Sequence, residues 1–68
     1  MIRVLVCDDH ALIRRGLTQL LKLAGDVEVT GEAANYGECR QRLRDQGCDV
    51  LVMDVDMPGK HEIGRAHV

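Results

Sequence analysis

Acidic residues stand at the ends of two apolar segments, and their carboxylates are the groups in this 68-residue chain with the clearest chemical use. Asp8 and Asp9 follow the run IRVLVC, and Asp54 and Asp56 follow the run VLVM, just before a Pro-Gly turn. Carboxylates held close together cannot all stay ionised without a cation, because each raises the proton affinity of the others. Oxygen ligands at an open crevice suit Mg²⁺, which keeps several waters and completes its shell from a phosphorylated substrate. The pattern indicates phosphoryl transfer, with Asp54 as the nucleophile that becomes an acyl phosphate.

These acids can meet only if the two apolar runs end at the same edge of a sheet. Residues 2–7 and 50–53 are nearly continuous apolar runs, typical of strands covered on both faces in a parallel sheet. Between them, residues 10–25 show helical spacing of apolar side chains, 27–33 have the pattern of a short strand, and 35–47 that of a polar helix closed by Gly47. Alternating strands and helices build a parallel sheet with right-handed crossovers.

The strand order decides whether the carboxylates share a site. If the first strand is central, with the other two strands on either side, Asp8, Asp9 and Asp54 meet in the crevice where the strand order reverses. Each motif alone has an ordinary structural explanation, since a strand-end acid pair is often a helix N-cap and DVDMPG has common turn chemistry. The conjunction of two apolar strands, each ending in acid, favours the shared site.

Capping residues set the expected helix ends. Asp9 or His10 would cap the first helix and Gly25 would close it. Asn35 lies near the start of the second helix, and Cys39 lies on its thin apolar side. Because His10 is explained as a helix-start residue, we do not expect a zinc site.

The composition argues against a nucleic-acid ligand and against a membrane segment. The net charge is −2, the basic residues are scattered, and there is one Tyr with no Phe or Trp, so we do not expect this segment to bind nucleic acid directly. We find no signal peptide and no apolar run near the length of a membrane span, and expect a cytoplasmic protein. Cys7, Cys39 and Cys48 lack CxxC spacing, and two of them lie inside or beside apolar runs, where a free thiol acts as a small hydrophobe.

Three stretches, VLVCDDHALIRRGLTQLL, VTGEAANYGE and DVLVMDVDMPG, carry a family resemblance. Over about residues 1–60 the chain resembles the response-regulator receiver domain of two-component systems, of the NarL/FixJ type that carries a LuxR-family helix-turn-helix output domain. The resemblance implies an α/β fold with a flavodoxin-like, doubly wound parallel sheet, truncated after its third strand. It makes Asp54 the phosphoacceptor and a ligand of one Mg²⁺ ion. Asp9 would ligate this ion directly, Asp8 through water, and Asp56 through its backbone carbonyl.

The resemblance also implies partners. A sensor histidine kinase would donate the phosphoryl group, and the full-length protein would be a DNA-binding transcriptional regulator whose output domain is absent from this sequence. We expect a phosphoacceptor that assists its own phosphorylation and not an enzyme with substrate turnover.

The end of the sequence departs from the family pattern. Residues 1–60 are interpreted as a partial receiver domain and 61–68 as a non-native or frame-shifted tail. The Ser/Thr and Lys that end the family's fourth and fifth strands have no counterpart, so phosphorylation is expected to be slow. An apolar third strand with an unpaired edge leads us to expect edge-paired or domain-swapped oligomers.

Two alternatives stay open. The chain could be an inert fragment that keeps its acids without anything to couple them to. It could also be a phosphatase of the haloacid-dehalogenase type, because Asp54 and Asp56 match that family's Asp-x-Asp pair, although Met57 and Pro58 follow where a small residue and a threonine belong.

Overall fold

The computed structural model describes residues 1–54, which form five alternating elements. They are β1 (Ile2–Cys7), α1 (Ala11–Lys22), β2 (Val27–Ala33), α2 (Tyr36–Asp45) and β3 (Val50–Met53). The order confirms the predicted alternation of strands and helices. The Pro-Gly turn, the Asp56 carbonyl and the tail at 61–68 lie outside the described residues.

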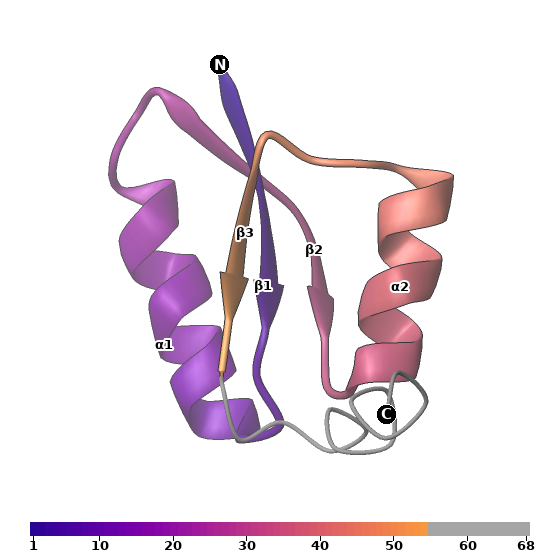
Figure 1. Ribbon diagram of the computed structural model, residues 1–68. Helices are drawn as coiled ribbons and strands as arrows, with labels where there is room; N and C mark the ends of the chain where they lie inside the picture. Colours follow the sequence, from indigo (N-terminus) through magenta and orange to yellow (C-terminus); the bar gives the residue numbers. More distant parts are fainter. Residues whose placement is uncertain (55–68) are drawn as a thin grey trace.

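β1 is the central strand of the sheet. The strand order is β2-β1-β3, and both pairings are parallel. Cys7, the last residue of β1, lies opposite Ala33 of β2 and Met53 of β3, so all three strands end at one edge. Figure 1 shows the strands between α1 and α2, with the three arrowheads at the same end. The strand order reverses at β1, which is the predicted doubly wound arrangement.

The core lies along β1. Val4, Leu5, Val6 and Cys7 are all buried. Leu5 and Cys7 pack in one cluster with Ala33 of β2 and Cys39 of α2, and with the partly buried Tyr36, Cys48 and Met53 around it. Burial of consecutive residues explains why the β1 sequence is continuously apolar instead of alternating, since both faces of the strand are covered by a helix.

α1 buries less of its apolar surface than its spacing predicts. Leu12 and Leu20 are 86% and 66% exposed, whereas Thr18 is 3% exposed. The Thr18 hydroxyl has no hydrogen-bond partner within the described part of the chain. On β3, Val50 and Leu51 are also exposed. Residues 1–54 therefore leave apolar surface uncovered on α1 and β3.

The helix ends correct one prediction. α1 begins after His10, which takes the N-cap position without a side-chain capping bond. The helix ends at Lys22 with Leu23 as its C-cap, so the prediction that Gly25 closes it was wrong. Gly25 lies further along, in the turn toward β2, with a φ of 70°. Gly47, with a φ of 68°, does follow the end of α2, where its amide donates to the Leu43 carbonyl at 3.0 Å.

α2 has a reciprocal cap at its start. The Asn35 side chain accepts a hydrogen bond from the Glu38 amide at 2.9 Å, and the Glu38 carboxylate accepts one from the Ala34 amide at 2.8 Å. This arrangement satisfies two amides at the helix start that have no intrahelical partner. Because α2 is short, polar and buries little apolar surface, this cap helps to define where the helix begins.

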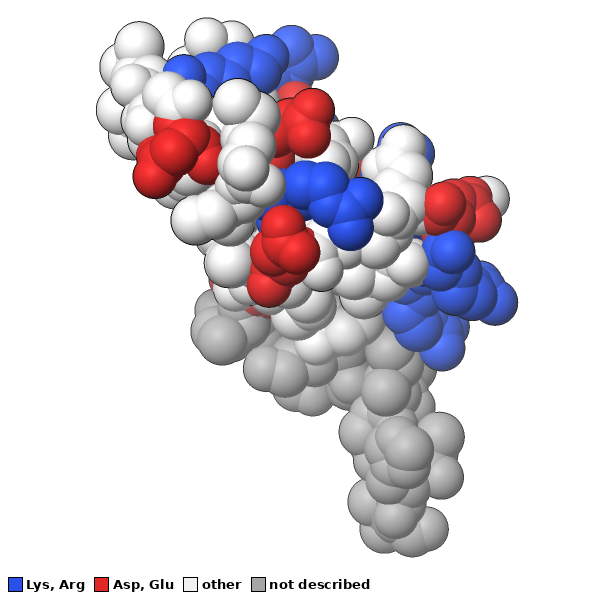
Figure 2. All heavy atoms as spheres, turned by 90° about the horizontal axis from the view of Figure 1, so that it is seen from above, with Lys and Arg blue, Asp and Glu red and all other residues white. Residues whose placement is uncertain are grey.

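Charged side chains of both signs are spread over the end of the molecule at which the strands begin. Figure 2 looks onto this face and shows Lys and Arg interspersed with Asp and Glu. Among the described residues, no helix is long and apolar enough to span a membrane. The acidic residues at the strand ends lie at the opposite end of the sheet (Figure 1).

Removing the α2 cap should lower stability without touching the strand ends. Asn35→Ala is expected to lower the free energy of unfolding by about 1 kcal/mol, because the Glu38 amide loses its acceptor. Urea unfolding followed by circular dichroism measures this. Asn35→Ser, which keeps a capping oxygen, should stay close to wild type, and equal losses in both variants would contradict the capping role.

Candidate metal and phosphoryl-transfer site

Backbone hydrogen bonds at the sheet edge place two of the acids. The Asp8 amide donates to the Ala33 carbonyl of β2 at 3.0 Å, and the Asp54 amide donates to the Cys7 carbonyl of β1 at 3.0 Å. These bonds continue the two ladders one residue past the strands. Asp8 and Asp54 are therefore held side by side by the parallel register itself and not by a loop.

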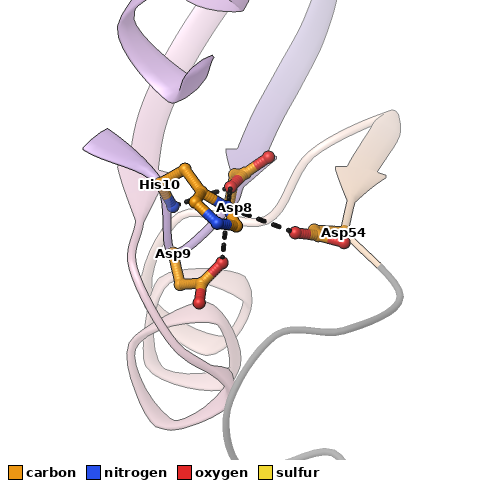
Figure 3. Close-up of side chains that lie close together, drawn as sticks. All are labelled: Asp8, Asp9, His10 and Asp54. Atoms are coloured by element: carbon orange, nitrogen blue, oxygen red, sulfur yellow. Dashed lines mark hydrogen bonds and ion pairs between the residues drawn. The ribbon is translucent and has the colours of Figure 1, made fainter. Parts of the chain in front are cut away.

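Four side chains converge at this edge. Asp8, Asp9, His10 and Asp54 each offer one ligand atom, and the four atoms all lie within 4.8 Å of one another. Figure 3 shows the side chains that follow β1 facing Asp54, which follows β3. The structure thus brings together the three carboxylates that the sequence placed at strand ends. Asp56, the fourth predicted ligand, lies outside the described residues.

His10 is the member of this group that sequence reasoning missed. Its Nδ1 lies 3.1 Å from Asp8 Oδ1, 3.0 Å from Asp9 Oδ1 and 3.8 Å from Asp54 Oδ2. Its amide also donates to Asp8 Oδ1 at 2.8 Å. The available signal was its position directly after two strand-end acids. That signal was assigned to helix capping, a role its side chain does not take.

The proton affinities of Asp8 and His10 respond to this packing. The hydrogen bond from the His10 amide holds the pKa of Asp8 below its ordinary value, with the His10 ring and Arg14 adding to the effect. The hydrogen bond to Asp8 raises the pKa of His10, and the charges of Asp9 and Asp54 act in the same direction. Without a metal ion, an imidazolium between the carboxylates is thereby favoured.

These shifts define a pH window for stability. A raised His10 pKa stabilises the fold below the ordinary value of 6.5, and this contribution is lost as pH rises through the raised pKa. A lowered Asp8 pKa stabilises above the ordinary value of 3.8, and this contribution is lost as pH falls through the lowered pKa. The contact between the two residues is therefore at full strength between about pH 4 and 6.5.

The donor set fits a divalent cation. Three carboxylates supply hard oxygen ligands, and opposite ligands of an octahedral Mg²⁺ ion lie roughly 4.2 Å apart. The three carboxylate oxygens and His10 Nδ1 all lie within 4.8 Å of one another, so no two of these oxygens are much further apart than two opposite ligands of one ion. Side-chain exposure grades across the site, from 10% at Asp8 to 21% at Asp54 and 30% at Asp9. A cation and a phosphorylated molecule could both reach Asp9 and Asp54 from solvent.

The sequence and fold of the chain have close counterparts among known proteins. The family model of the response regulator receiver domain matches residues 4–63. Among solved structures, the signal receiver domain of the response regulator NarL from Mycobacterium tuberculosis is 40% identical with a TM-score of 0.82, over 85% of this chain and 47% of that one. A two-component response regulator of the LuxR family from Aurantimonas sp. SI85-9A1 is 34% identical with a TM-score of 0.82, over 87% of this chain and 42% of that one.

Characterised relatives of similar sequence also include response regulators. Response regulator GacA from Pseudomonas viridiflava is 46% identical over 59 residues, which are 87% of this chain and 28% of that protein. Oxygen regulatory protein NreC from Staphylococcus haemolyticus is 39% identical over 56 residues, 82% of this chain and 26% of that protein. The chain belongs to the response regulator receiver domain family. It spans about a quarter of the length of these two relatives.

The raised proton affinity of His10 can be measured directly. In metal-free protein, an NMR titration of its imidazole should give a pKa above 6.5, and Asp8→Asn should move that pKa back toward 6.5. Asp49→Asn is the control, because Asp49 pairs with Arg3 at the other end of the sheet. An unchanged His10 pKa in Asp8→Asn would contradict the geometry of the cluster.

Proposed function

We propose that this chain is the phosphoacceptor module of a two-component response regulator, with Asp54 as the residue that receives the phosphoryl group. The observation that carries the proposal is the convergence of Asp8, Asp9 and Asp54 at one sheet edge. Membership of the receiver family supports the same reading.

The resemblance to the receiver family gives each residue its proposed role. Asp9, the more exposed acid after β1, would ligate Mg²⁺ directly, and the more buried Asp8 would hold it through water. Asp54 would contribute an oxygen from the end of β3, and the Asp56 carbonyl would be a further ligand. When bound, Mg²⁺ neutralises charge on the phosphoryl oxygens as they approach these carboxylates. His10 Nδ1 has to leave its position between the carboxylates when the ion enters.

The transfer itself is a displacement at phosphorus. A carboxylate oxygen of Asp54 attacks the phosphorus of a phosphohistidine, the P–N bond breaks, and the donor imidazole leaves with the electron pair and takes a proton from solvent. The product is an acyl phosphate on Asp54. The hydrogen bond from the Asp54 amide to the Cys7 carbonyl fixes the backbone beneath the nucleophile, so the carboxylate keeps its orientation.

The partners follow from the chemistry and from the relatives. A phosphohistidine donor means a sensor histidine kinase. The similarity to a LuxR-family response regulator supports a transcriptional role for the whole protein, with an output domain that binds DNA. Edge-paired or domain-swapped association stays a prediction. It would involve β3, which within the described residues pairs with β1 on one side.

We propose that the chain is labelled once and does not turn over substrate. One relative, a protein-glutamate methylesterase/protein-glutamine glutaminase from Methanococcoides burtonii, is 45% identical over 58 residues that make up 16% of its length. The activity in that name belongs to that protein. A receiver unit thus occurs in proteins of different activity, which is consistent with an accessory phosphoacceptor.

Phosphorylation by a small donor tests the proposal without a kinase. Incubation with acetyl phosphate and Mg²⁺ should add one hydroxylamine-labile phosphoryl group per chain, detected by intact mass. Asp54→Asn should abolish the label, whereas Asp49→Asn, at the other end of β3, should keep it. Continued release of phosphate would instead indicate a phosphatase. A wild-type chain that binds Mg²⁺ but is never labelled would be an inert fragment.

The cation ligands can be tested separately from the transfer. Asp9→Asn should weaken Mg²⁺ binding at least about tenfold, because the ion loses a full negative charge at contact distance. Mg²⁺ titration followed by the amide shifts of Asp8, Asp9 and Asp54 measures the dissociation constant. The same affinity in wild type and Asp9→Asn would rule out Asp9 as a ligand.

A further inference from the structure

Arg14, a basic residue of α1, connects the cluster of Asp8, Asp9 and Asp54 to the neighbouring strand β2. It lies in the first turns of α1, and its side chain is 17% exposed. Its Nη1 donates to the Asp8 carbonyl at 2.8 Å, and its Nε donates to Glu32 Oε1 at 3.0 Å. One planar guanidinium therefore connects the end of β1, the helix α1 and a carboxylate of β2.

The Asp8 carbonyl belongs to the peptide unit that joins Asp8 to Asp9. A peptide unit is planar, so a hydrogen bond on its oxygen also fixes the direction in which the Asp9 amide and Cα leave. Asp8 is already held from its other side by the bond from its amide to Ala33. The bond from Arg14 fixes the next link, and with it the position of the Cα atom from which the Asp9 side chain extends.

The positive charge of Arg14 by itself would lower the affinity of the site for a metal ion, which is the opposite of what positioning does. A cation near the site repels a metal ion, so Arg14 would weaken metal binding if charge were its only contribution. Glu32 lies against the guanidinium and offsets this charge. The fork of N–H donors lets Arg14 reach the carboxylate and the carbonyl at once, which a lysine ammonium, a single compact group, cannot reproduce.

We propose that Arg14 is a positioning residue for the cation site: anchored by Glu32, it holds the peptide between Asp8 and Asp9 so that both carboxylates face Asp54. This inference rests on the proposed function, because it assumes that Mg²⁺ binds there. A purely structural tie between α1 and β2 is the alternative. Positioning predicts a loss of metal affinity when Arg14 is removed, whereas charge alone predicts a gain.

Arg15 supplies a matched control. It carries the same charge on the same helix and lies 3.8 Å from Glu32, but its side chain is 74% exposed. Asn35→Ala supplies a second control, since it is expected to lower stability through the α2 cap. Arg15→Met reports the effect of losing a charge, and Asn35→Ala reports the effect of losing stability. Any further effect of Arg14 variants then comes from the lost bond to the Asp8 carbonyl.

The test compares Mg²⁺ dissociation constants, from amide shifts, in four variants of the 68-residue chain. Arg14→Met and Arg14→Lys should each weaken binding about tenfold or more, as losses of supporting hydrogen bonds at metal sites do. Arg15→Met and Asn35→Ala should bind as wild type or, for Arg15→Met, slightly more tightly. Thermal unfolding without Mg²⁺ reports the stability of each variant.

The outcomes distinguish a failure of the positioning role of Arg14 from a failure of the proposed function. If wild type binds Mg²⁺ and Arg14→Met binds it equally or more tightly, the positioning role is overturned and the proposed function stands. Equal weakening in Arg14→Lys and Asn35→Ala would assign the effect to stability and also overturn it. If Arg14→Met does not fold, the contrast between Arg14→Lys and Arg15→Met decides. A wild-type chain without any Mg²⁺ response would overturn the proposed function itself.

Discussion

The parallel pairing of β1 with β3 is the constraint on which the site depends. Asp8 and Asp54 come from positions far apart in the sequence and lie together because Cys7 is opposite Met53 and the Asp54 amide continues the ladder. A shift of one residue in this register would turn the side chains of β3 to the opposite face of the sheet. Backbone hydrogen bonds at both ends of β3 oppose such a shift, since the Asp49 amide donates to the Arg3 carbonyl and the Asp54 amide to the Cys7 carbonyl. Stability and function are thus coupled through one strand pair.

Bringing carboxylates together is unfavourable by itself, and the chain offsets it locally. The His10 amide and ring both contact Asp8, and Arg14 caps the Asp8 carbonyl while its own charge is offset by Glu32. His10 and Arg14 follow Asp8 and Asp9 closely in the sequence, at the end of β1 and the start of α1. The same short segment therefore carries two of the acids and the groups that offset their repulsion. These contacts hold the three carboxylates together before any ion binds, and the reorganisation that binding requires is the departure of His10 Nδ1 from between them.

Periodicity predicted the element order. The central position of β1 was a condition that the family resemblance implied, and the meeting of the three acids followed from that condition. His10 was correctly placed at the start of α1, where it is the N-cap residue, but the contacts of its ring with the acids were not predicted. The end of α1 was misplaced because Gly25 can adopt a positive φ in the turn as well as at a helix end. The contacts of Arg14 could not be predicted either, since they depend on the relative placement of α1 and β2, which no local pattern encodes.

The most direct test is an experimental structure of the chain grown with Mn²⁺, whose anomalous scattering locates the ion. The expected result is a single strong peak with carboxylate oxygens of Asp9 and Asp54 at about 2.2 Å and Asp8 one water further away. Such a peak would place the cation where the ends of β1 and β3 meet. Mn²⁺ bound elsewhere, with Asp8, Asp9 and Asp54 turned away from one another, would contradict the account.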